Sequence, residues 1–290
     1  MNSKVIWQAP TASGLGDRLC DLLFVRAFAE MVGSELRTFW PGFEIKAVDA
    51  PHRQTDILLE NVLKYIKLPP AIVFDEPKNI LEPPSLSKSD VIFNKYVGGA
   101  FTTQTFFDRY VNPHLCLRSF PEFEAAVSKV KTMFGFSAEI TDYLKNLPKN
   151  FVALHIRRGD KICYTLGTAD KYQCHLSEVD YLNTLTYKTI DYFNSAGLKI
   201  IFICGDEDEK TKPFHDYALS LGFAIIQTPK MEKWKQTYYD LAIMSKANSI
   251  VTAMKYSSFG MFPSLIGNGN FTTSYRIVEN VDRYEPLIRG

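Results

Sequence analysis

The chain has 290 residues, of which 46% are hydrophobic and 22% are charged, and its formal net charge is +1. This composition is typical of a globular protein and excludes a fibrous or largely disordered chain. The near-neutral charge argues against a general nucleic-acid binder, although it leaves room for a local basic site that binds an anionic small molecule.

The cysteines are odd in number and scattered, at Cys20, Cys116, Cys163, Cys174 and Cys204. None forms a C-x-x-C pair, so the pattern indicates neither a disulfide framework nor a zinc site, and we expect a reducing, cytoplasmic setting. No apolar run reaches the roughly 18 residues that a membrane span needs. The N-terminal segment also lacks the pattern of a signal peptide.

The first half of the chain opens as a βα unit. A strand is predicted over 4–9, a glycine-containing turn over 10–18, and a helix over 19–33 that stops at Gly33. The remaining segments of this half are predicted as strands at 36–40, 43–50 and 71–76, helices at 55–66, 102–111, 121–136 and 137–148, and a loop rich in Pro and Ser at 77–90.

The second half alternates strands and helices more regularly. The predicted strands are 151–157, 198–204, 223–228 and 249–254, and the predicted helices are 178–197, 208–222, 236–247 and 258–267. This alternation is typical of an α/β protein, in which helices cover both faces of a parallel sheet. Ligands of such sheets bind at the carboxyl ends of the strands.

Polar clusters follow three of these strands where each one ends. His155, Arg157, Arg158 and Asp160 end the first strand, Gly205-Asp206-Glu207 end the second, and Lys255-Tyr256-Ser257-Ser258 end the last. The carboxyl ends of parallel strands meet at one edge of a sheet, so we expect these clusters to converge.

Arginine suits an anionic ligand, because its rigid guanidinium donates two parallel hydrogen bonds to phosphate oxygens. Arg157 and Arg158 point to opposite sides if the strand continues through them. One can then face the ligand and the other can pair with an acidic neighbour. Two solvated surface ion pairs, worth about 0–1 kcal/mol each, would give the same sequence pattern.

Two further segments have a possible ligand role and an ordinary alternative. In "GLGDR", Gly14 and Gly16 allow close approach to a ligand and precede a helix N-terminus, yet a tight βα turn needs the same residues. The loop is not a G-x-G-x-x-G motif, because Leu19 takes the place of the third glycine. In "YSSFG", two hydroxyl groups precede a short helix and could hold phosphate or simply cap the helix.

Taken together, these segments resemble the GDP-fucose-dependent fucosyltransferases, the superfamily that spans α1,2-, α1,6- and protein O-fucosyltransferases. "HIRRGDK" is similar to their H-x-R-R-x-D motif, and "IIFICGDEDE" to their strand that ends in an acidic pair. "YYDLAIMSKANSIVTAMKYSSFGMF" resembles their D-L-x-x-M-S … S-S-F-S-x-W segment, and "GLGDRL" resembles their N-terminal glycine loop. The motifs occur in the family's order, while residues 35 to 145 match no motif of it.

The resemblance implies a GT-B-like glycosyltransferase with two Rossmann-type halves and parallel sheets. Its lobes would be an N-terminal acceptor-side lobe over 1–148 and a C-terminal lobe over 149–290 that binds the nucleotide sugar. The family inverts the anomeric centre and needs no metal or other cofactor; "DED" at 206–208 could clamp a metal, but the family segment explains it better.

The resemblance also implies roles for individual residues. Arg157 would bind the β-phosphate and offset charge on the leaving diphosphate, with His155 and Asp160 holding it in place. Asp240 would accept from the guanine edge. The remaining donor-binding residues would be Gly14, Gly16, Asp206, Ser257, Ser258 and Phe259.

The sequence departs from the family pattern at two places. Asp17-Arg18 replaces Asn-Gln in the glycine loop, and Gly260 and Phe262 replace the serine and tryptophan of S-F-S-x-W. The second change leaves the identity of the sugar less certain than phosphate binding. The first makes Asp17 a candidate general base, with a dipole-stabilising carboxylate at a helix N-terminus as the alternative.

The sequence therefore predicts transfer of L-fucose from GDP-fucose to a glycan hydroxyl. The alternatives are the same machinery with another nucleotide sugar, carrying a deoxyhexose or a pentose, and a non-catalytic protein that binds nucleotide sugars or glycans. A P-loop kinase or ATPase is disfavoured, because no G-x-x-x-x-G-K-[ST] motif is present.

Overall fold

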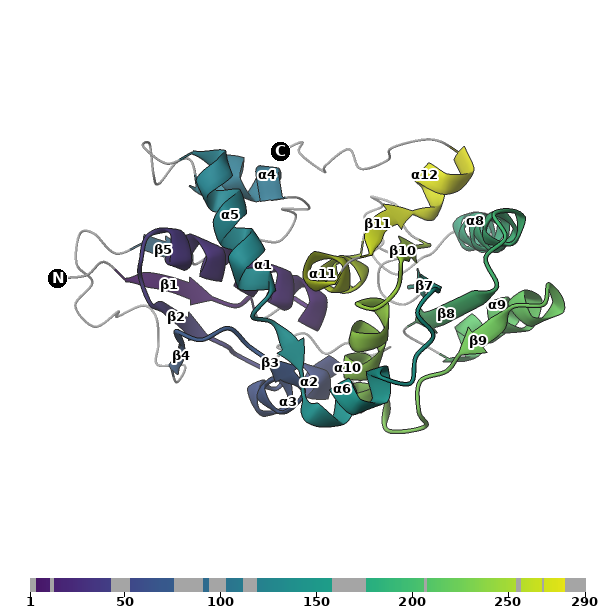
Figure 1. Cartoon of the computed structure of the whole chain (residues 1–290), viewed down its shortest axis with the longest axis horizontal. Coiled ribbons are helices and arrows are strands. Elements are labelled where there is room, and N and C mark those ends of the chain that lie inside the picture. Colours follow the sequence, from purple (N-terminus) through teal and green to yellow (C-terminus); the bar gives the residue numbers. More distant parts are fainter. Residues whose placement is uncertain are drawn as a thin grey trace. The chain divides into compact units, whose positions relative to one another are not determined.

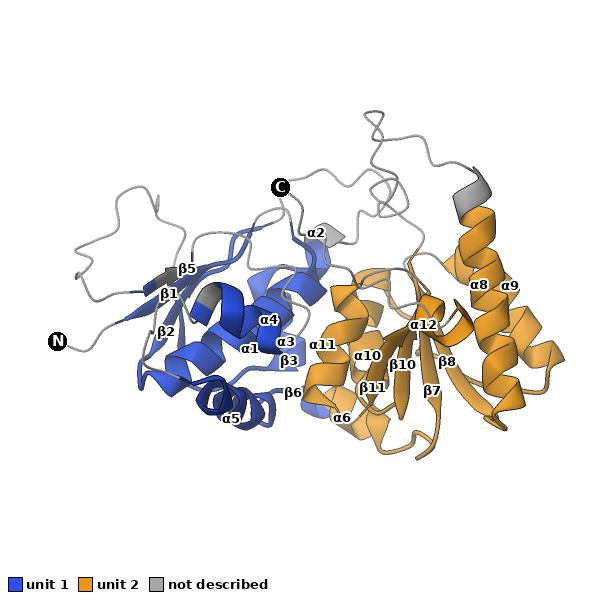
Figure 2. Cartoon of the chain, turned by 90° about the horizontal axis from the view of Figure 1, so that it is seen from above, with its two compact units in different colours: residues 1–46, 53–138 blue, residues 47–52, 139–290 orange. Residues whose placement is uncertain are grey.

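The computed structural model describes residues 4–10, 13–42, 53–75, 91–93, 103–111, 119–157, 176–205, 208–253, 257–267 and 269–279. The chain divides into two compact units, each with a parallel sheet of its own. The first unit comprises Met1–Lys46 and Arg53–Ala138, and the second Ala47–His52 and Glu139–Gly290 (Figure 2).

The first unit is built on a four-stranded sheet in the order β4-β2-β1-β5. Its strands are β1 (Val5–Gln8), β2 (Leu36–Phe39), β4 (Ile72–Asp75) and β5 (Val91–Phe93), and all neighbours are parallel. The predicted strands at 4–9, 36–40 and 71–76 are confirmed. The strand β5 was not predicted, because three apolar residues in a polar stretch are too short to show a period. The strand predicted over 43–50 lies outside the described residues.

The helices of the first unit differ from the prediction mainly at their ends. They are α1 (Leu15–Met31), α2 (Arg53–Asp56), α3 (Leu59–Tyr65), α4 (Thr103–Phe106), the π-helix η1 (Phe107–Val111) and α5 (Phe120–Lys131). The helix predicted over 121–136 ends early because Gly135 and Phe136 form β6, which pairs with β3 (Ile66–Lys67) in an antiparallel ribbon. The helix predicted over 55–66 divides in two.

Helix α1 is the central element of this unit. Every residue from Leu15 to Ala29 is buried, including charged ones, because the helix packs against the sheet and against α5 (Figure 1). Stacked aromatic rings connect it outward: Phe24 of α1 stacks on Phe106 at 5.0 Å between ring centroids, and Phe106 stacks on Phe123 of α5 at 5.6 Å. Aromatic packing therefore connects the middle of α1 to α4 and α5.

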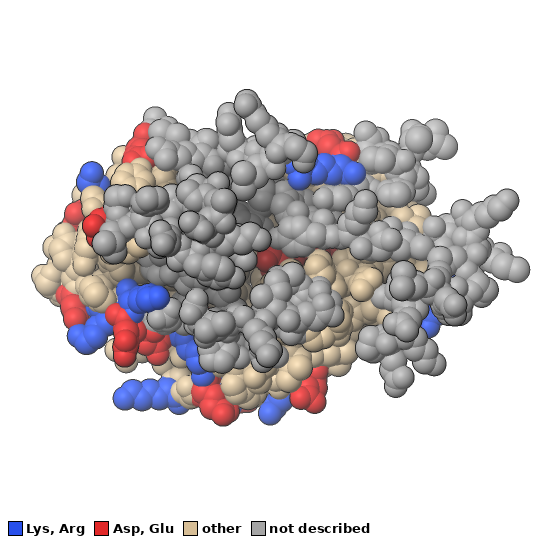
Figure 3. Space-filling view, turned by 180° about the vertical axis from the view of Figure 1, so that it is seen from behind, with Lys and Arg blue, Asp and Glu red and all other residues tan. Residues whose placement is uncertain are grey.

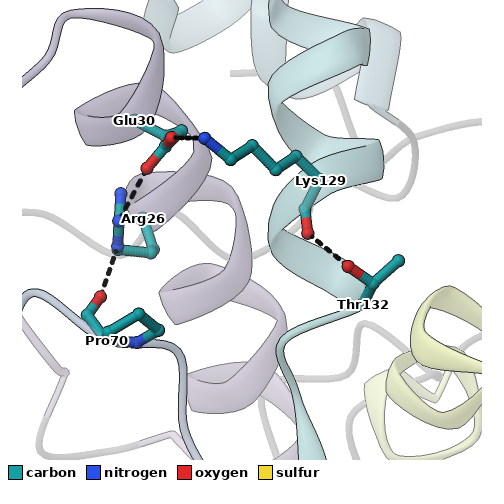
Figure 4. A network of polar contacts seen from close by, with 5 residues as sticks. All are labelled: Arg26, Glu30, Pro70, Lys129 and Thr132. Atoms are coloured by element: carbon teal, nitrogen blue, oxygen red, sulfur yellow. Dashed lines mark hydrogen bonds and ion pairs between the residues drawn. The ribbon is translucent and has the colours of Figure 1, made fainter.

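A polar network fastens the other end of the same helix (Figure 4). Arg26 donates to Glu30 at 2.7 Å and to the carbonyl oxygen of Pro70 at 3.0 Å, and Lys129 of α5 pairs with the same glutamate. The ammonium of Lys129 and the guanidinium of Arg26 lower the pKa of Glu30. The network thus joins α1, α5 and the segment that precedes β4.

The second unit has a five-stranded parallel sheet in the order β11-β10-β7-β8-β9. The strands are β7 (Val152–Ile156), β8 (Ile200–Gly205), β9 (Ala224–Ile226), β10 (Ser249–Thr252) and β11 (Asn270–Thr273). The four predicted strands are confirmed. The fifth, "NFTT", was missed because its mostly polar residues lack the apolar pattern of a buried strand.

Helices cover both faces of this sheet, as predicted from the alternation. Helices α8 (Leu176–Ser195) and α9 (Asp208–Ser220) lie on one face, and α10 (Lys233–Met244) and α11 (Ser258–Ile266) lie on the other (Figure 2). Two shorter helices complete the unit, α6 (Ala138–Leu144) and α12 (Ser274–Glu279). Helix α6 packs on α10, with the rings of Tyr143 and Tyr239 at 5.5 Å, which explains why this unit begins near residue 139.

The described surface carries charges of both signs side by side. On the face shown in Figure 3, acidic and basic side chains alternate along the described rim, in keeping with the net charge of +1. Searching the described segments for a helix that is both long and apolar enough to cross a membrane yields none.

Candidate functional site

Strand β7 carries the charged cluster because its side chains alternate between two different surroundings. Val152, Leu154 and Ile156 belong to the apolar core formed with α8 and α9. His155 points to the opposite face, where its ring lies 5.1 Å from that of Phe259 on α11. Arg157 follows the strand with the same parity as His155 and is only 9% exposed. The strand thus delivers both residues to the α11 side of the sheet.

Helix α11 lies close to the sheet because of Gly260. A Cβ built at this position would stand 3.1 Å from the ring of Phe271, 3.7 Å from Ile250 and 3.9 Å from Nδ1 of His155. A serine here would crowd the ring of Phe271, while its distances to Ile250 and His155 would be ordinary contacts. The glycine therefore allows the first turn of α11 to lie against Phe271 and near His155.

Two buried hydroxyl groups lie at this end of the sheet. Ser257 is the N-cap residue of α11 and is 0% exposed, yet its side chain makes no capping bond. Thr252 ends β10 directly beside His155 in the register and is also 0% exposed. Neither Oγ has a hydrogen-bond partner within the described part of the chain. Ordinary capping does not explain Ser257.

The start of α11 adds backbone donors to these hydroxyl groups. The first N–H groups of any helix lack intrahelical partners, and the helix dipole favours an anion there. Ser258, which opens the helix, is 2% exposed. A guanidinium, buried hydroxyl groups and helix N–H groups at one strand end have the chemistry of a phosphate site.

The neighbouring strand reaches the same edge without a side chain. Gly205 ends β8 beside Ile156, and an added Cβ would lie 2.3 Å from the carbonyl oxygen of Ile156 and 2.6 Å from Thr211. Only glycine allows β8 to pass this close to the end of β7. The position is therefore structural, and it keeps the edge beside Arg157 free of bulk.

Asp240 of α10 is another buried polar residue on this face of the sheet. The residue is 4% exposed and accepts a hydrogen bond at 2.6 Å from the hydroxyl of Thr228. Ile226 of β9 pairs with Phe202, which in turn pairs with Ala153. Thr228 follows two residues after this last pair, where β9 has already ended.

The carboxyl group of Asp240 changes its charge close to neutral pH. Burial raises its pKa to about 7, while the Thr228 hydrogen bond and the ammonium of Lys233 oppose that rise and the carboxylate of Asp208 adds to it. Lys233 and Asp208 also pair with each other at 2.6 Å. A carboxyl group that titrates near pH 7 in a buried place is typical of a binding or catalytic site.

The first unit places Gly14, Gly16 and Asp17 at the start of α1. The helix begins at Leu15, four residues earlier than predicted, so Gly16 and Asp17 lie in its first turn. Gly14 is the N-cap with an ordinary φ of −74°, and an added Cβ would meet nothing within 4 Å. Among the described residues, neither strain nor packing requires a glycine there, and close approach of a ligand stays a prediction.

Asp17 is 7% exposed and lies one turn before Asp21, which is 3% exposed. Burial raises the pKa of Asp21 well above its usual range, and the Asp17 carboxylate raises it further. The same two causes, with Asp21 added, raise the pKa of the Cys20 thiol. Asp21 was not identified from the sequence, although its i, i+4 spacing from Asp17 marks a shared helix face.

The structure therefore brings together most of the predicted donor site. His155, Arg157, Ser257, Ser258 and Phe259 gather at the ends of β7 and β10, and Asp240 lies on the same side of the sheet. Thr228 and Thr252 are additions that the sequence did not reveal, although Thr252 shares the strand parity of His155. Arg158, Asp160 and Asp206 lie outside the described residues.

Within the described residues, no group of three His, Cys, Asp or Glu side chains is arranged to hold a metal ion.

No protein-family model matches the sequence, and no curated protein is similar to it. Solved structures share its fold. NodZ alpha-1,6-fucosyltransferase soaked with GDP-fucose aligns with a TM-score of 0.51 and 12% sequence identity over 92% of this chain and 93% of that one. The selenomethionine fucosyltransferase NodZ from Bradyrhizobium aligns with a TM-score of 0.51 and 11% sequence identity, over 92% of this chain and 93% of that one. POFUT1 in complex with GDP-fucose aligns with a TM-score of 0.47 and 17% sequence identity, over 94% of this chain and 97% of that one.

At these identities the likeness concerns the fold. It confirms the predicted α/β class with parallel sheets, and the chain has the fold of the NodZ fucosyltransferase.

Proposed function

We propose that the protein is an inverting, metal-independent glycosyltransferase that moves L-fucose from GDP-fucose to a hydroxyl group of a glycan. The observation that carries this proposal is the set of buried polar groups at the start of α11. Ser257 has a fully buried hydroxyl with no described partner, beside the strand that carries His155 and Arg157. An unsatisfied buried hydroxyl costs about 1–3 kcal/mol. A phosphate oxygen would satisfy it.

The second unit would hold the donor. Arg157 would bind the β-phosphate, and His155, Asp160 and Ser258 would keep the diphosphate in place. Asp240 would accept from N1–H and the 2-amino group of guanine. Neighbouring strands lie about 4.8 Å apart, so β9 and β7 are roughly 10 Å apart, a span that suits the base and the β-phosphate of one extended nucleotide. The fold supports this reading, since NodZ, which shares it, was soaked with GDP-fucose.

The first unit would serve the acceptor through Asp17. The bond between the fucose anomeric carbon and the β-phosphate oxygen breaks, and its electron pair leaves with GDP. The acceptor oxygen forms the new bond from the opposite side, which inverts the centre, and its proton passes to the Asp17 carboxylate. Arg157 would offset the charge that develops on the leaving diphosphate.

A thermal-shift screen of nucleotides and nucleotide sugars tests the proposal, because a ligand of the native state raises the melting temperature. We expect GDP and GDP-fucose to stabilise the protein more than UDP, UDP-sugars or ADP. Stabilisation by a UDP-sugar instead would transfer the proposal to another donor. Retained GDP binding without turnover on any offered glycan would favour the non-catalytic alternative.

Metal independence is tested separately by chelation. Because arginine and helix N–H groups are available to offset the diphosphate charge, we expect transfer at the full rate in excess EDTA. Loss of turnover that manganese restores would contradict metal independence and would favour a metal site at the acidic residues 206–208. The cytoplasmic location stays a prediction from the cysteine pattern, which cell fractionation would check.

A further inference from the structure

The contact between Thr228 and Asp240 joins two segments that the sequence does not connect. Thr228 lies two residues beyond the end of β9, and Asp240 is twelve residues later on α10. Its hydroxyl donates to Oδ1 of the carboxylate at 2.6 Å. This distance is typical of a hydrogen bond from a hydroxyl to an ionised acceptor. At 4% exposure, Asp240 has little access to water that could replace the bond.

The other ionisable groups around Asp240 come from three elements. Lys233 lies two turns earlier on α10 and pairs with Asp208 of α9. Tyr143 of α6 donates to the carbonyl oxygen of Gln227, and burial, followed by the Asp240 carboxylate, raises the pKa of its phenol. Glu139 of α6 is occupied by Tyr239 at 2.8 Å and Lys235 at 2.9 Å. Among the described residues, the direct hydrogen bond to the carboxyl group of Asp240 comes from Thr228.

We propose that Thr228 selects the base of the donor: its hydrogen bond holds Asp240 in the ionised form that pairs with guanine and rejects adenine. The inference rests on the proposed function, in which Asp240 faces the base. Thr228 is a positioning residue in this reading, because it acts on the base through Asp240.

The selection follows from the donors and acceptors of the two purines. Guanine presents two donors, N1–H and the 2-amino group, which an ionised carboxylate accepts side by side. Adenine presents an acceptor at N1 beside a donor at the 6-amino group, so an ionised carboxylate meets one lone pair with another. A neutral carboxyl group reverses the preference, since its O–H donates to N1 of adenine while its carbonyl oxygen accepts from the amino group.

Because the Asp240 carboxyl group titrates near neutral pH, the preference for GDP over ADP should depend on pH and on the hydrogen bond from Thr228. With a pKa of about 7 for Asp240, the ionised fraction at pH 5.5 is small, and the apparent Kd for GDP should rise about 30-fold relative to the fully ionised protein. ADP should bind more tightly over the same interval. The diphosphate titrates alike in both ligands, so the ratio of the two affinities isolates the base.

The experiment measures Kd for GDP, ADP and UDP by calorimetry from pH 5.5 to 8.5. In the unmodified protein, the GDP preference over ADP should fall with a midpoint near pH 7. Thr228→Val removes the hydroxyl at nearly constant volume and should move this midpoint up by about one to two pH units. Thr228→Ser should restore it. The matched control is Thr186→Val, which removes another buried threonine hydroxyl, one that bonds within α8.

The pair formed by half-buried Lys233 and exposed Asp208 gives a second measurement that does not depend on the fold tolerating Thr228→Val. Lys233→Met should move the midpoint up, because it removes a favourable positive charge. Asp208→Asn should move it down, because it removes a negative charge; Asp208 is 76% exposed and its loss is structurally mild. Opposite shifts from these two variants support titration at Asp240.

The outcomes separate this inference from the function on which it rests. If GDP binds at pH 8 and Asp240→Asn weakens it, but the midpoint is the same in Thr228→Val as in the unmodified protein, then Thr228 does not select the base and the proposed function stands. A GDP-to-ADP ratio that is constant across the pH range overturns the inference in the same way. If GDP binds no better than ADP and UDP at any pH, both proposals are wrong.

Discussion

In the first unit, the buried guanidinium of Arg18 has a full set of partners within the chain. It donates to the carbonyl oxygens of Ser13, Pro41 and Gly42, and it lies over the ring of Trp40 at 5.4 Å. Burial lowers its pKa to about 10, opposed by nearby carboxylates, so it remains a cation at neutral pH. These hydrogen bonds connect the start of α1 to the segment that follows β2.

In the second unit, two buried hydroxyl groups near the start of α11 lack hydrogen-bond partners among the described residues. Ser257 and Thr252 are fully buried, and their hydroxyl groups have no described partner. Both regions bury polar side chains near a helix N-terminus, so burial alone does not distinguish them. They differ in whether the described chain supplies the hydrogen bonds: it does so for Arg18, which we expect to be structural, and not for Ser257, which is the candidate for a ligand contact.

The largest effect expected is the loss of Arg157 from the ligand-facing region. Arg157→Ala should reduce transfer by about 10³–10⁵-fold, as for other arginines that offset developing phosphate charge. GDP binding should weaken as well, and Arg157→Lys should rescue little, because the two-pronged donor is lost. Steady-state kinetics and calorimetry check this. Full activity of Arg157→Ala would contradict the assignment of the site.

A substitution of Asp17 tests whether the start of α1 has a structural role or a role in catalysis. If it is the general base, Asp17→Asn should lower kcat by about 10²–10⁴-fold with nearly unchanged GDP affinity, and donor hydrolysis by water should fall too. A structural carboxylate would instead lower the melting temperature by losing about 0.3–1 kcal/mol of helix-dipole interaction, while kcat held. Measuring kcat, Kd and Tm on this variant separates the two roles.

Arg18 should behave as a structural residue. Arg18→Met leaves its carbonyl partners without donors, and we expect the free energy of unfolding to fall by about 2–4 kcal/mol. Kd for GDP should change by less than about twofold, because the described partners of Arg18, which are Ser13, Trp40, Pro41 and Gly42, are not among the predicted donor-binding residues. Arg37→Met is the control, since Arg37 is 35% exposed and its pair with Asp75 should contribute below about 1 kcal/mol. Urea unfolding compares the three proteins.

Asp240 gives a smaller effect with a defined sign. Its folded pKa of about 7 lies above the usual value, so the folded state keeps a proton that the unfolded chain has already released. Stability without ligand therefore falls as the pH rises from about 4 to 7 and stays lower above that. Asp240→Asn removes this loss and should raise the free energy of unfolding at pH 8.5 by about 1–3 kcal/mol.

At pH 4 and below, the same variant should match the unmodified protein. Asp142→Asn serves as the control, because Asp142 is 68% exposed and should show no such pH dependence. Equal stabilisation by Asp240→Asn at both pH values would mean that folding does not raise the pKa of the Asp240 carboxyl group.

Periodicity predicted the second unit well, because its strands are continuous apolar runs and its helices end at glycines such as Gly197 and Gly222. It failed where tertiary contacts decide the structure. The strands β6 and β11 form because a partner strand is available, and Gly135 or "NFTT" alone shows no such preference. The early start of α1 likewise depends on burial of its first turn within the unit rather than on a capping side chain.

The candidate site divides in the same way. His155, Arg157 and Ser257 were predictable because they stand at strand ends, where topology fixes their convergence. Asp240 was assigned from family resemblance, and no local pattern marks it. Thr228 could not have been found, since its role depends on the segment after β9 folding back onto α10.

The order of strands in the second unit has a consequence for how the protein is made. Strand β7 lies between β8 and β10, and the N–H of Phe151 just before it bonds to the side chain of Asn248, 97 residues later. A ribosome adding about 5–20 residues per second needs roughly 5–20 s to supply that partner. Through that interval one edge of an apolar strand is uncovered, a state prone to pairing with other chains. Helix α11 follows β10 in the chain, so the proposed nucleotide-binding edge is complete only after β7 has gained both neighbouring strands, and nucleotide binding would report that stage of folding.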